Sequence, residues 1–339
     1  MYEKVKVVGD PRESYFLLVG LLSLTSKLPS ILVCFIVNIV AIVILSRGRC
    51  SLSKCITFYL VAMAAADLSV VIFVVIFNRI LGIYIAANTL SATPMCRVKT
   101  LLVFATTDVS VWLTVAFTFD RFVAICCEKL KHKLCTKDCA AVIVGSVLVL
   151  SYVRNIPWYF ALEPLYMLDN LPLYCRLRSP FYTSPLWQSF SYFIRIATPV
   201  LPFVIILLLN VLTMRYIFVT SKARKVLLGK NGTDKRPDPE MDNRRKSIIL
   251  LFSISANFII LWLIYTAHYV YERCTKTYNY SYSGYNESVY IFEETGNMLL
   301  LLSCCTNTFI YAISQNKFRE ELNKLMQYPL HRIVRIVNM

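Results

Sequence analysis

The chain is poor in charged residues, glycine and histidine. Only 17% of its 339 residues are charged and 57% are hydrophobic, which excludes a protein whose whole surface is solvated. Glycine occurs 9 times and the apolar runs are continuous, which excludes an outer-membrane β-barrel. The histidines His132, His268 and His331 lie far apart, so a histidine-rich metal centre is excluded and a Ser-His-Asp catalytic group has little support.

Seven apolar segments dominate what remains, and most reach the roughly 20 residues that a helix needs to cross a bilayer. The fourth is interrupted by Arg154. We extend it through Trp158, because a basic side chain near a helix end can reach the membrane surface. The pattern predicts an all-α membrane protein with a seven-transmembrane helix bundle at 17–313. The expected spans are about 17–46, 55–79, 94–127, 137–160, 187–218, 244–272 and 289–313.

Basic residues indicate the orientation of this bundle. The net charge of +16 would suit nucleic acid as a partner, but nine Lys or Arg residues fall within 222–246, between the fifth and sixth spans. Cytoplasmic loops of membrane proteins collect such residues. We therefore expect a multi-pass protein with residues 1–16 outside, 314–339 in the cytoplasm, and lipids rather than nucleic acid around it. Residues 1–10 lack the apolar core of a cleavable signal peptide, so the first span is expected to direct insertion.

The 314–339 segment begins with apolar residues at helical spacing. Phe318, Leu322 and Leu325 alternate with Lys317 and Lys324. This pattern is typical of a short amphipathic helix that lies along the inner leaflet.

Most of the 12 cysteines fall in spans or on the cytoplasmic side, where thiols are expected to stay reduced. Cys96, Cys175 and Cys274 are expected outside, and two of these three should pair. A Cys96–Cys175 disulfide would pin the 161–186 loop over the bundle and leave Cys274 over. Asn279 and Asn286 begin glycosylation sequons in the third outer loop, which makes the chain an expected glycoprotein.

Polar residues are costly inside a membrane and therefore mark candidate functional positions. Several of them, together with short motifs, occur in an ordered series along the spans. The series is Asn38, Met63-Ala64-Ala65-Ala66-Asp67-Leu68, Cys96 placed 25 residues before Arg121, Asp120-Arg121, the aromatic pair Phe258 and Trp262, and Asn307-Thr308-Phe309-Ile310-Tyr311 followed by Phe318.

In order and spacing this series resembles the rhodopsin-like (class A) G-protein-coupled receptors. Around FDRFVAICCEKLKHKLCT and ANFIILWL the chain is similar to the orphan group typified by probable G-protein coupled receptor 139. The resemblance implies a plasma-membrane signal transducer that binds an extracellular ligand and activates a heterotrimeric G protein. For the subgroup it implies an aromatic amino acid or related ligand and Gq-type coupling.

The same resemblance assigns an activation switch, with departures from the family pattern. In this switch, Asp120 and Arg121 would stabilise the inactive state of the receptor through a charge-assisted hydrogen bond until activation releases Arg121 toward the G protein. Proline is replaced by Ile264 and Thr308, and tyrosine by Phe122 and Asn210. Arg244 stands where many relatives carry an acid, so an ionic lock with Arg121 is not expected. The switch residues are Asp120, Arg121, Phe258, Trp262, Asn307 and Tyr311.

A ligand pocket is expected at the outer ends of the spans. Val103 stands where amine receptors carry an aspartate, which argues against a simple monoamine. Arg195 could clamp a carboxylate or pair internally with Asp108. A short peptide is the alternative ligand, and a transporter or intramembrane enzyme is the competing class. The pocket residues are Arg79, Val103, Phe104, Asp108, Arg195, Trp262, Tyr265, His268, Tyr269, Glu293 and Asn297.

A polar cluster in the middle of the bundle resembles the sodium site of many relatives. An ionised Asp67 would need a cation there, and a protonated, hydrogen-bonded Asp67 is the open alternative. Cys304 makes the shell imperfect. No other cofactor is expected. The possible sodium ligands are Asp67, Ser110, Ser303 and Asn307.

Overall fold

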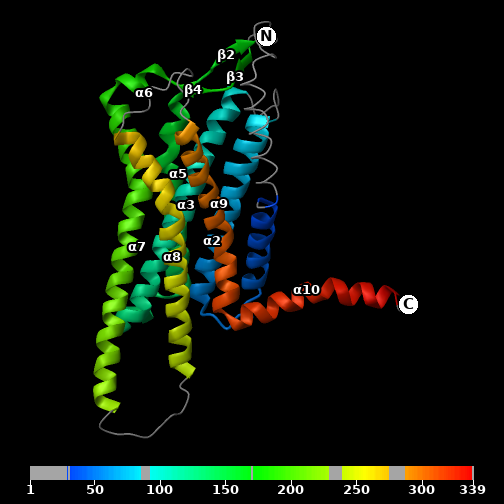
Figure 1. Cartoon of the computed structure of the whole chain (residues 1–339), viewed down its shortest axis with the longest axis vertical. Helices are drawn as coiled ribbons and strands as arrows, with labels where there is room; N and C mark the ends of the chain where they lie inside the picture. Colours follow the sequence, from blue (N-terminus) through cyan, green and yellow to red (C-terminus); the bar gives the residue numbers. More distant parts are fainter. Residues whose placement is uncertain are drawn as a thin grey trace.

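The computed structural model describes residues 29, 31–84, 92–168, 171–228, 239–274 and 287–337, with some side chains inside the helices left undescribed. Long helices run side by side as a bundle, with short strands at one end and a sideways helix, α10, at the other (Figure 1). Six described helices are long and apolar enough to cross a membrane, and the helix Ile31–Ser46 is a shorter apolar one. The all-α, seven-helix fold is thereby confirmed. The expected 17–28 part of the first span lies outside the described residues.

The elements follow one another in a simple order. After the first helix, Ile31–Ser46, α2 continues directly into the π-helix η2, and the chain ends in α10. The helices are α2 Lys54–Val70, η2 Val71–Tyr84, α3 Thr93–Cys126, α4 Glu128–Leu134, α5 Lys137–Phe160, α6 Ser179–Thr183, α7 Pro185–Leu228, α8 Pro239–Cys274, α9 Glu287–Ser314 and α10 Asn316–Val337. The strands are β1 Leu162–Glu163, β2 Tyr166–Leu168, β3 Leu171–Leu173 and β4 Arg176–Leu177.

Local sequence sets several helix starts and one tight turn. The Ser53 hydroxyl accepts the Ile56 amide at 3.3 Å and caps α2, and the Thr136 hydroxyl accepts the Cys139 amide at 3.2 Å and caps α5. Gly48 follows the first helix with φ +67°, a left-handed conformation that suits a residue without a Cβ.

Helix α3 lies at the centre of the bundle and packs against α2, α5, α7 and α8. Its Phe117 is fully buried and meets the Tyr59 ring of α2 edge to face, with centroids 6.4 Å apart. By contrast, α5 leaves Val142 and Val149 exposed on its outer face at 68% and 62%. An apolar surface of this kind is the one expected to face lipid.

The segment between α5 and α7 covers one end of the bundle. Strand β1 pairs with β4 and β2 with β3, both antiparallel. The Cys96–Cys175 disulfide ties this segment to the start of α3, and the Thr93 hydroxyl donates to the Tyr174 carbonyl at 2.7 Å. The predicted disulfide is therefore confirmed.

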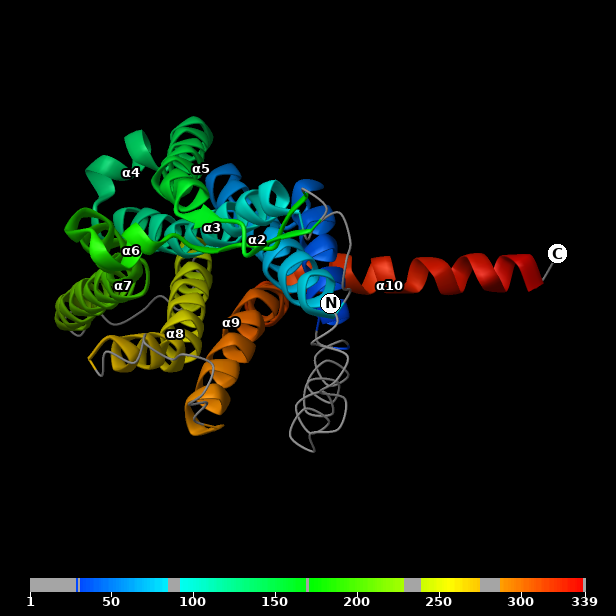
Figure 2. The ribbon, with the colours of Figure 1, turned by 90° about the horizontal axis from the view of Figure 1, so that it is seen from above.

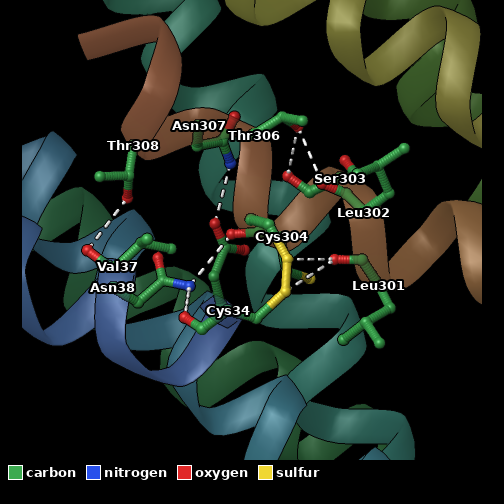
Figure 3. Close-up of a disulfide and its surroundings, with 12 residues drawn as sticks. Cys34, Val37, Asn38, Leu301, Leu302, Ser303, Cys304, Thr306, Asn307 and Thr308 are labelled. Carbon is green, nitrogen blue, oxygen red and sulfur yellow. Dashed lines mark hydrogen bonds between the residues drawn. A yellow bond between two sulfur atoms is a disulfide. The ribbon is translucent and has the colours of Figure 1, made fainter. Parts of the chain in front are cut away.

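A second disulfide joins Cys34 of the first helix to Cys305 of α9, with Cα atoms 4.7 Å apart (Figure 3). The expectation that cysteines within the spans remain thiols is wrong at these two positions. That expectation came from the redox compartment, whereas the pairing depends on the close approach of two helices that are 271 residues apart in sequence.

Candidate functional site

The Asp120–Arg121 pair lies buried at the end of α3 nearest α10. Arg121 Nε donates to Asp120 Oδ2 at 2.9 Å, and a second guanidinium nitrogen contacts the same oxygen. The two residues are 5% and 4% exposed. The Arg121 guanidinium also lies 5.9 Å from the Phe117 ring centroid, within cation–π range. Burial makes this charge-assisted contact stronger than a solvated surface pair.

One hydrogen bond connects this pair to α8. Arg121 Nη1 donates to the Ser247 hydroxyl at 3.3 Å. The partner that Arg121 contacts on α8 is therefore a neutral hydroxyl and not a carboxylate. Such a long bond to an uncharged acceptor is weaker than the two-nitrogen contact with Asp120.

Two thiols surround Asp120, a feature that sequence reasoning missed. Cys55 of α2 donates to Asp120 Oδ1 at 3.2 Å, and Cys135, between α4 and α5, donates to the Asp120 carbonyl at 3.6 Å. Burial, followed by the negative charge of Asp120, raises the pKa of Cys135 to about 12, so it remains a protonated donor. Asp120 is thus held by neighbours from α2 and from the connection after α4.

A second polar cluster surrounds Asp67 in the middle of the bundle. The Ser110 hydroxyl donates to Asp67 Oδ1 at 2.6 Å, and the Asn307 amide donates to Oδ2 at 2.8 Å. Ser303 and Cys304 are buried side by side on α9 next to this cluster. The structure therefore brings together Asp67 of α2, Ser110 of α3 and Asn307 of α9.

Asn38 links the first helix to this region of α9. Its amide donates to the Cys34 carbonyl at 2.9 Å and to the Cys304 carbonyl at 3.1 Å (Figure 3). One turn further along α9, the Thr308 hydroxyl donates to the Val37 carbonyl at 3.4 Å. The first helix and α9 are consequently joined by side chains as well as by a disulfide.

The aromatic switch residues form two groups. Phe258 stacks on Trp262 with centroids 5.3 Å apart, and Trp262 meets Tyr265 edge to face at 5.6 Å. Tyr311 is fully buried and lies edge to face with Phe318 at 6.2 Å. The first group belongs to α8, and the second joins α9 to α10.

Asp108 is the centre of a network that connects α3, α5 and α7. Arg154 Nε donates to Asp108 Oδ2 at 3.1 Å, and the Asn155 amide donates to the same oxygen at 2.6 Å. The Thr198 hydroxyl lies 3.0 Å from Oδ1 and 2.7 Å from Arg154 Nη2. Both carboxylate oxygens of this buried acid therefore have partners.

The sequence-based expectation for Arg154 is wrong. Its side chain does not run to the membrane surface but turns inward to form an ion pair with Asp108. The physical reason is that burying a carboxylate together with a cation costs less free energy than burying the carboxylate without a partner.

The residues expected to line the ligand pocket fall into separate groups in the structure. Phe104 stacks on Trp158 with centroids 4.8 Å apart, inside an aromatic cluster with Phe181 and Trp187. Phe104 and Asp108 thus contact α5 and α7, whereas Trp262 and Tyr265 belong to α8. Val103 and Asn297 are half-buried. The side chains of Arg79, Arg195, His268, Tyr269 and Glu293 lie outside the described residues, as do the sequons at Asn279 and Asn286.

Residues 37–311 match the family described as "7 transmembrane receptor (rhodopsin family)". The matched residues include the polar cluster around Asp67, the Asp108 network and the Asp120–Arg121 pair. Because it covers most of the chain, the protein belongs to this family of multi-pass membrane receptors. It is a signalling receptor that couples to G proteins and not an enzyme.

The Asp108 network makes a test of stability possible. Arg154→Ala should destabilise the receptor by about 3–5 kcal/mol, because Asp108 would stay buried without its cation. The measurement is the apparent thermal midpoint of the purified receptor in nanodiscs. The double variant Arg154→Ala/Asp108→Asn should recover most of the lost stability, because it no longer buries an unpaired carboxylate.

Arg176→Ala is the matched control, because Arg176 pairs with Glu163 at 2.9 Å but is 60% exposed. Arg176→Ala should lower the stability of the receptor by less than about 1 kcal/mol. Equal midpoints for Arg154→Ala and Arg176→Ala would show that the buried pair does not stabilise the bundle.

Proposed function

We propose that this receptor lies in the plasma membrane with its N-terminus outside, and that it responds to a small aromatic ligand by activating a Gq-type G protein. Its agonists would be aromatic amino acids or related molecules. The observation that carries the signalling part is the buried Asp120–Arg121 pair, in which Asp120 accepts from the Cys55 thiol and Arg121 donates to the Ser247 hydroxyl of α8. The subgroup similarity around Phe119–Thr136 and Ala256–Leu263 supports the ligand class and the coupling.

Charge supports the proposed orientation. The described α10 end carries Arg47, Arg49, Lys129 and Lys131, all exposed. An excess of Lys and Arg favours the cytoplasmic side of a membrane. The opposite end carries the Cys96–Cys175 disulfide, which suits an oxidising exterior.

The Asp108 network supports a role for Arg195 in ligand binding. Arg195 had two interpretations, an internal partner of Asp108 or a clamp for a ligand carboxylate. Arg154, Asn155 and Thr198 already bond to both Asp108 oxygens. Asp108 therefore does not need Arg195 for neutralisation, which favours the clamp. The same pairing argues against Asp108 as the counter-ion of an amine ligand.

A sodium ion at Asp67 belongs to this proposal. Carboxylate and hydroxyl oxygens of Asp67, Ser110 and Ser303 are suitable ligands for a small hard cation. Burial opposes a negatively charged Asp67, whereas the donors from Ser110 and Asn307 stabilise one, and a bound cation would offset the remaining cost of the buried charge. The Cys304 thiol replaces one oxygen donor, so the residues fit the ion in part.

The ligand proposal is tested by calcium mobilisation in cells that express the chain. Tryptophan or phenylalanine should raise cytosolic calcium, and Arg195→Ala should lower agonist potency by a factor of ten or more, since a charge-assisted pair contributes about 1.5–3 kcal/mol. Surface expression is matched by antibody labelling. The loop variant Arg176→Ala should leave potency unchanged.

A peptide response that survives Arg195→Ala would contradict the clamp and reassign the ligand. If no amino acid or peptide raises cytosolic calcium while the receptor is present at the cell surface, both the subgroup assignment and the proposed Gq-type coupling are contradicted.

The thiol that bonds to Asp120 gives a second test, made without agonist. Cys55→Ala removes a donor to the switch carboxylate, which should raise basal nucleotide exchange on a purified G protein about fivefold, equivalent to about 1 kcal/mol. Cys55→Ser keeps a donor and should stay near the wild-type rate. The measurement is GTPγS loading per folded receptor.

Cys50→Ala is the matched control, because Cys50 is a buried thiol of the same core cluster but is not one of the two that bond to Asp120. Equal basal rates for Cys50→Ala and Cys55→Ala would contradict a specific role of Cys55 in the off state.

A further inference from the structure

Helix α10 leaves the bundle sideways instead of continuing along it. It starts beside the end of α9 and extends away from the other helices (Figures 1 and 2). Its first turns are firmly docked: Phe318 is fully buried against Tyr311, and Leu322 and Leu325 pack against the main core cluster. A helix in this position lies in the plane of a membrane that the bundle crosses.

A carboxylate is buried where α10 meets the turn after the first helix. Glu321 is only 6% exposed, and Lys324 Nζ lies 2.7 Å from its Oε1. Arg49 Nη1 approaches Oε2 at 3.9 Å. The Lys324 hydrogen bond, with smaller effects from the charges of Arg49 and Arg47, holds the pKa of Glu321 below its usual range. The acid therefore stays ionised and fixes basic side chains around itself.

The charges at this junction do not balance. Arg47, Arg49 and Lys324 supply three positive charges around the single negative charge of Glu321. Their charged ends face outward, since the Arg49 and Lys324 side chains are 69% and 66% exposed and Arg47 is exposed as well. The neighbouring Lys317 pairs with Glu320 at 3.0 Å and is locally neutralised. An excess of two positive charges thus remains at the level where the helix lies on the membrane.

We propose that Arg47, Arg49 and Lys324 bind the headgroup of an anionic phospholipid that carries phosphate monoester groups, a phosphoinositide. Two guanidinium groups suit the bidentate recognition of phosphate oxygens. Basic residues next to a transmembrane helix attract such lipids, and the docked α10 places these residues beside the headgroup layer. Glu321 acts as a positioning residue that holds Lys324 and Arg49 and also repels part of the anion's charge. This site is independent of the agonist and of the G protein.

The test measures binding of a fluorescent phosphatidylinositol bisphosphate to the purified full chain in phosphatidylcholine nanodiscs. The double variant Arg47→Gln/Arg49→Gln should weaken binding about thirtyfold, because each basic residue near a membrane contributes about fivefold. Glu321→Gln should strengthen binding severalfold, because it removes the one negative charge of the site. A merely structural role of Glu321 would not predict a gain.

Lys129→Gln/Lys131→Gln is the matched control, with the same loss of two exposed positive charges at the same end of the bundle. It should change binding by less than about threefold. Thermal midpoints are measured for every variant to exclude unfolding.

Four outcomes would overturn the proposal. Equal losses from the two double variants would indicate a general electrostatic effect. Tighter binding of soluble inositol trisphosphate than of the lipid would make the ligand a free phosphate. Unchanged or weaker binding by a folded Glu321→Gln variant would contradict the inference that the negative charge of Glu321 opposes binding of the anionic headgroup. Binding of phosphatidylserine equal to that of the bisphosphate would contradict the preference for phosphate monoesters.

Discussion

A buried charge inside a membrane must find a partner within the protein, and α3 meets this requirement for the whole bundle. Its Asp108 takes a cation from α5, and its Asp120 pairs with the adjacent Arg121. Its Ser110 donates to Asp67 of α2. Because no water is available in the hydrocarbon region, the Asp108 and Ser110 contacts fix the distances from α3 to α5 and α2 more strictly than apolar packing does. The central position of α3 and the placement of its neighbours both follow from these contacts.

The contacts at the middle of α3 and at its α10 end differ in strength, which has a consequence for switching. Near the middle, Asp108 joins α5 and α7 through a charged pair and two further donors. At the α10 end, α8 is held to α3 by the Arg121–Ser247 hydrogen bond, a neutral acceptor at 3.3 Å. A ligand of moderate differential affinity can only shift an equilibrium that is already nearly balanced. At this end, separating α8 from α3 therefore breaks one weak polar contact, in addition to the apolar packing of Leu250 and Ile254.

Sequence reasoning was most successful where the signal is local or compositional. Apolar length defined the bundle, and the Asp120-Arg121 motif and the Cys96–Cys175 pair could be named in advance. It was wrong about Arg154, because nearness to a helix end says nothing about direction. The helical spacing of Ser151, Asn155 and Trp158 with Arg154 did contain a signal, since the three are buried and mark the inward side of α5. The Cys34–Cys305 bond and the Cys55 contact to Asp120 depend on tertiary packing, which no local pattern encodes.

The missing prolines can be understood from the same contacts. At position 308, where relatives carry proline, the Thr308 hydroxyl bonds to Val37, so α9 is tied to the first helix through Thr308, Asn38 and the disulfide. Helix α9 is thus a fixed support. Helix α8 has Ile264 where the family pattern has a kinking proline. It lies close to α9 at Gly296, where a Cβ would come within 3.3 Å of the Tyr265 Cα. Thr306 adds a 2.8 Å bond to Asn257 closer to the α10 end. Helix α8 nevertheless bends along its length (Figures 1 and 2). Because it is supported at Tyr265 and Asn257 and weakly held at Ser247, its α10-side part is expected to move while the part beyond these supports stays in place.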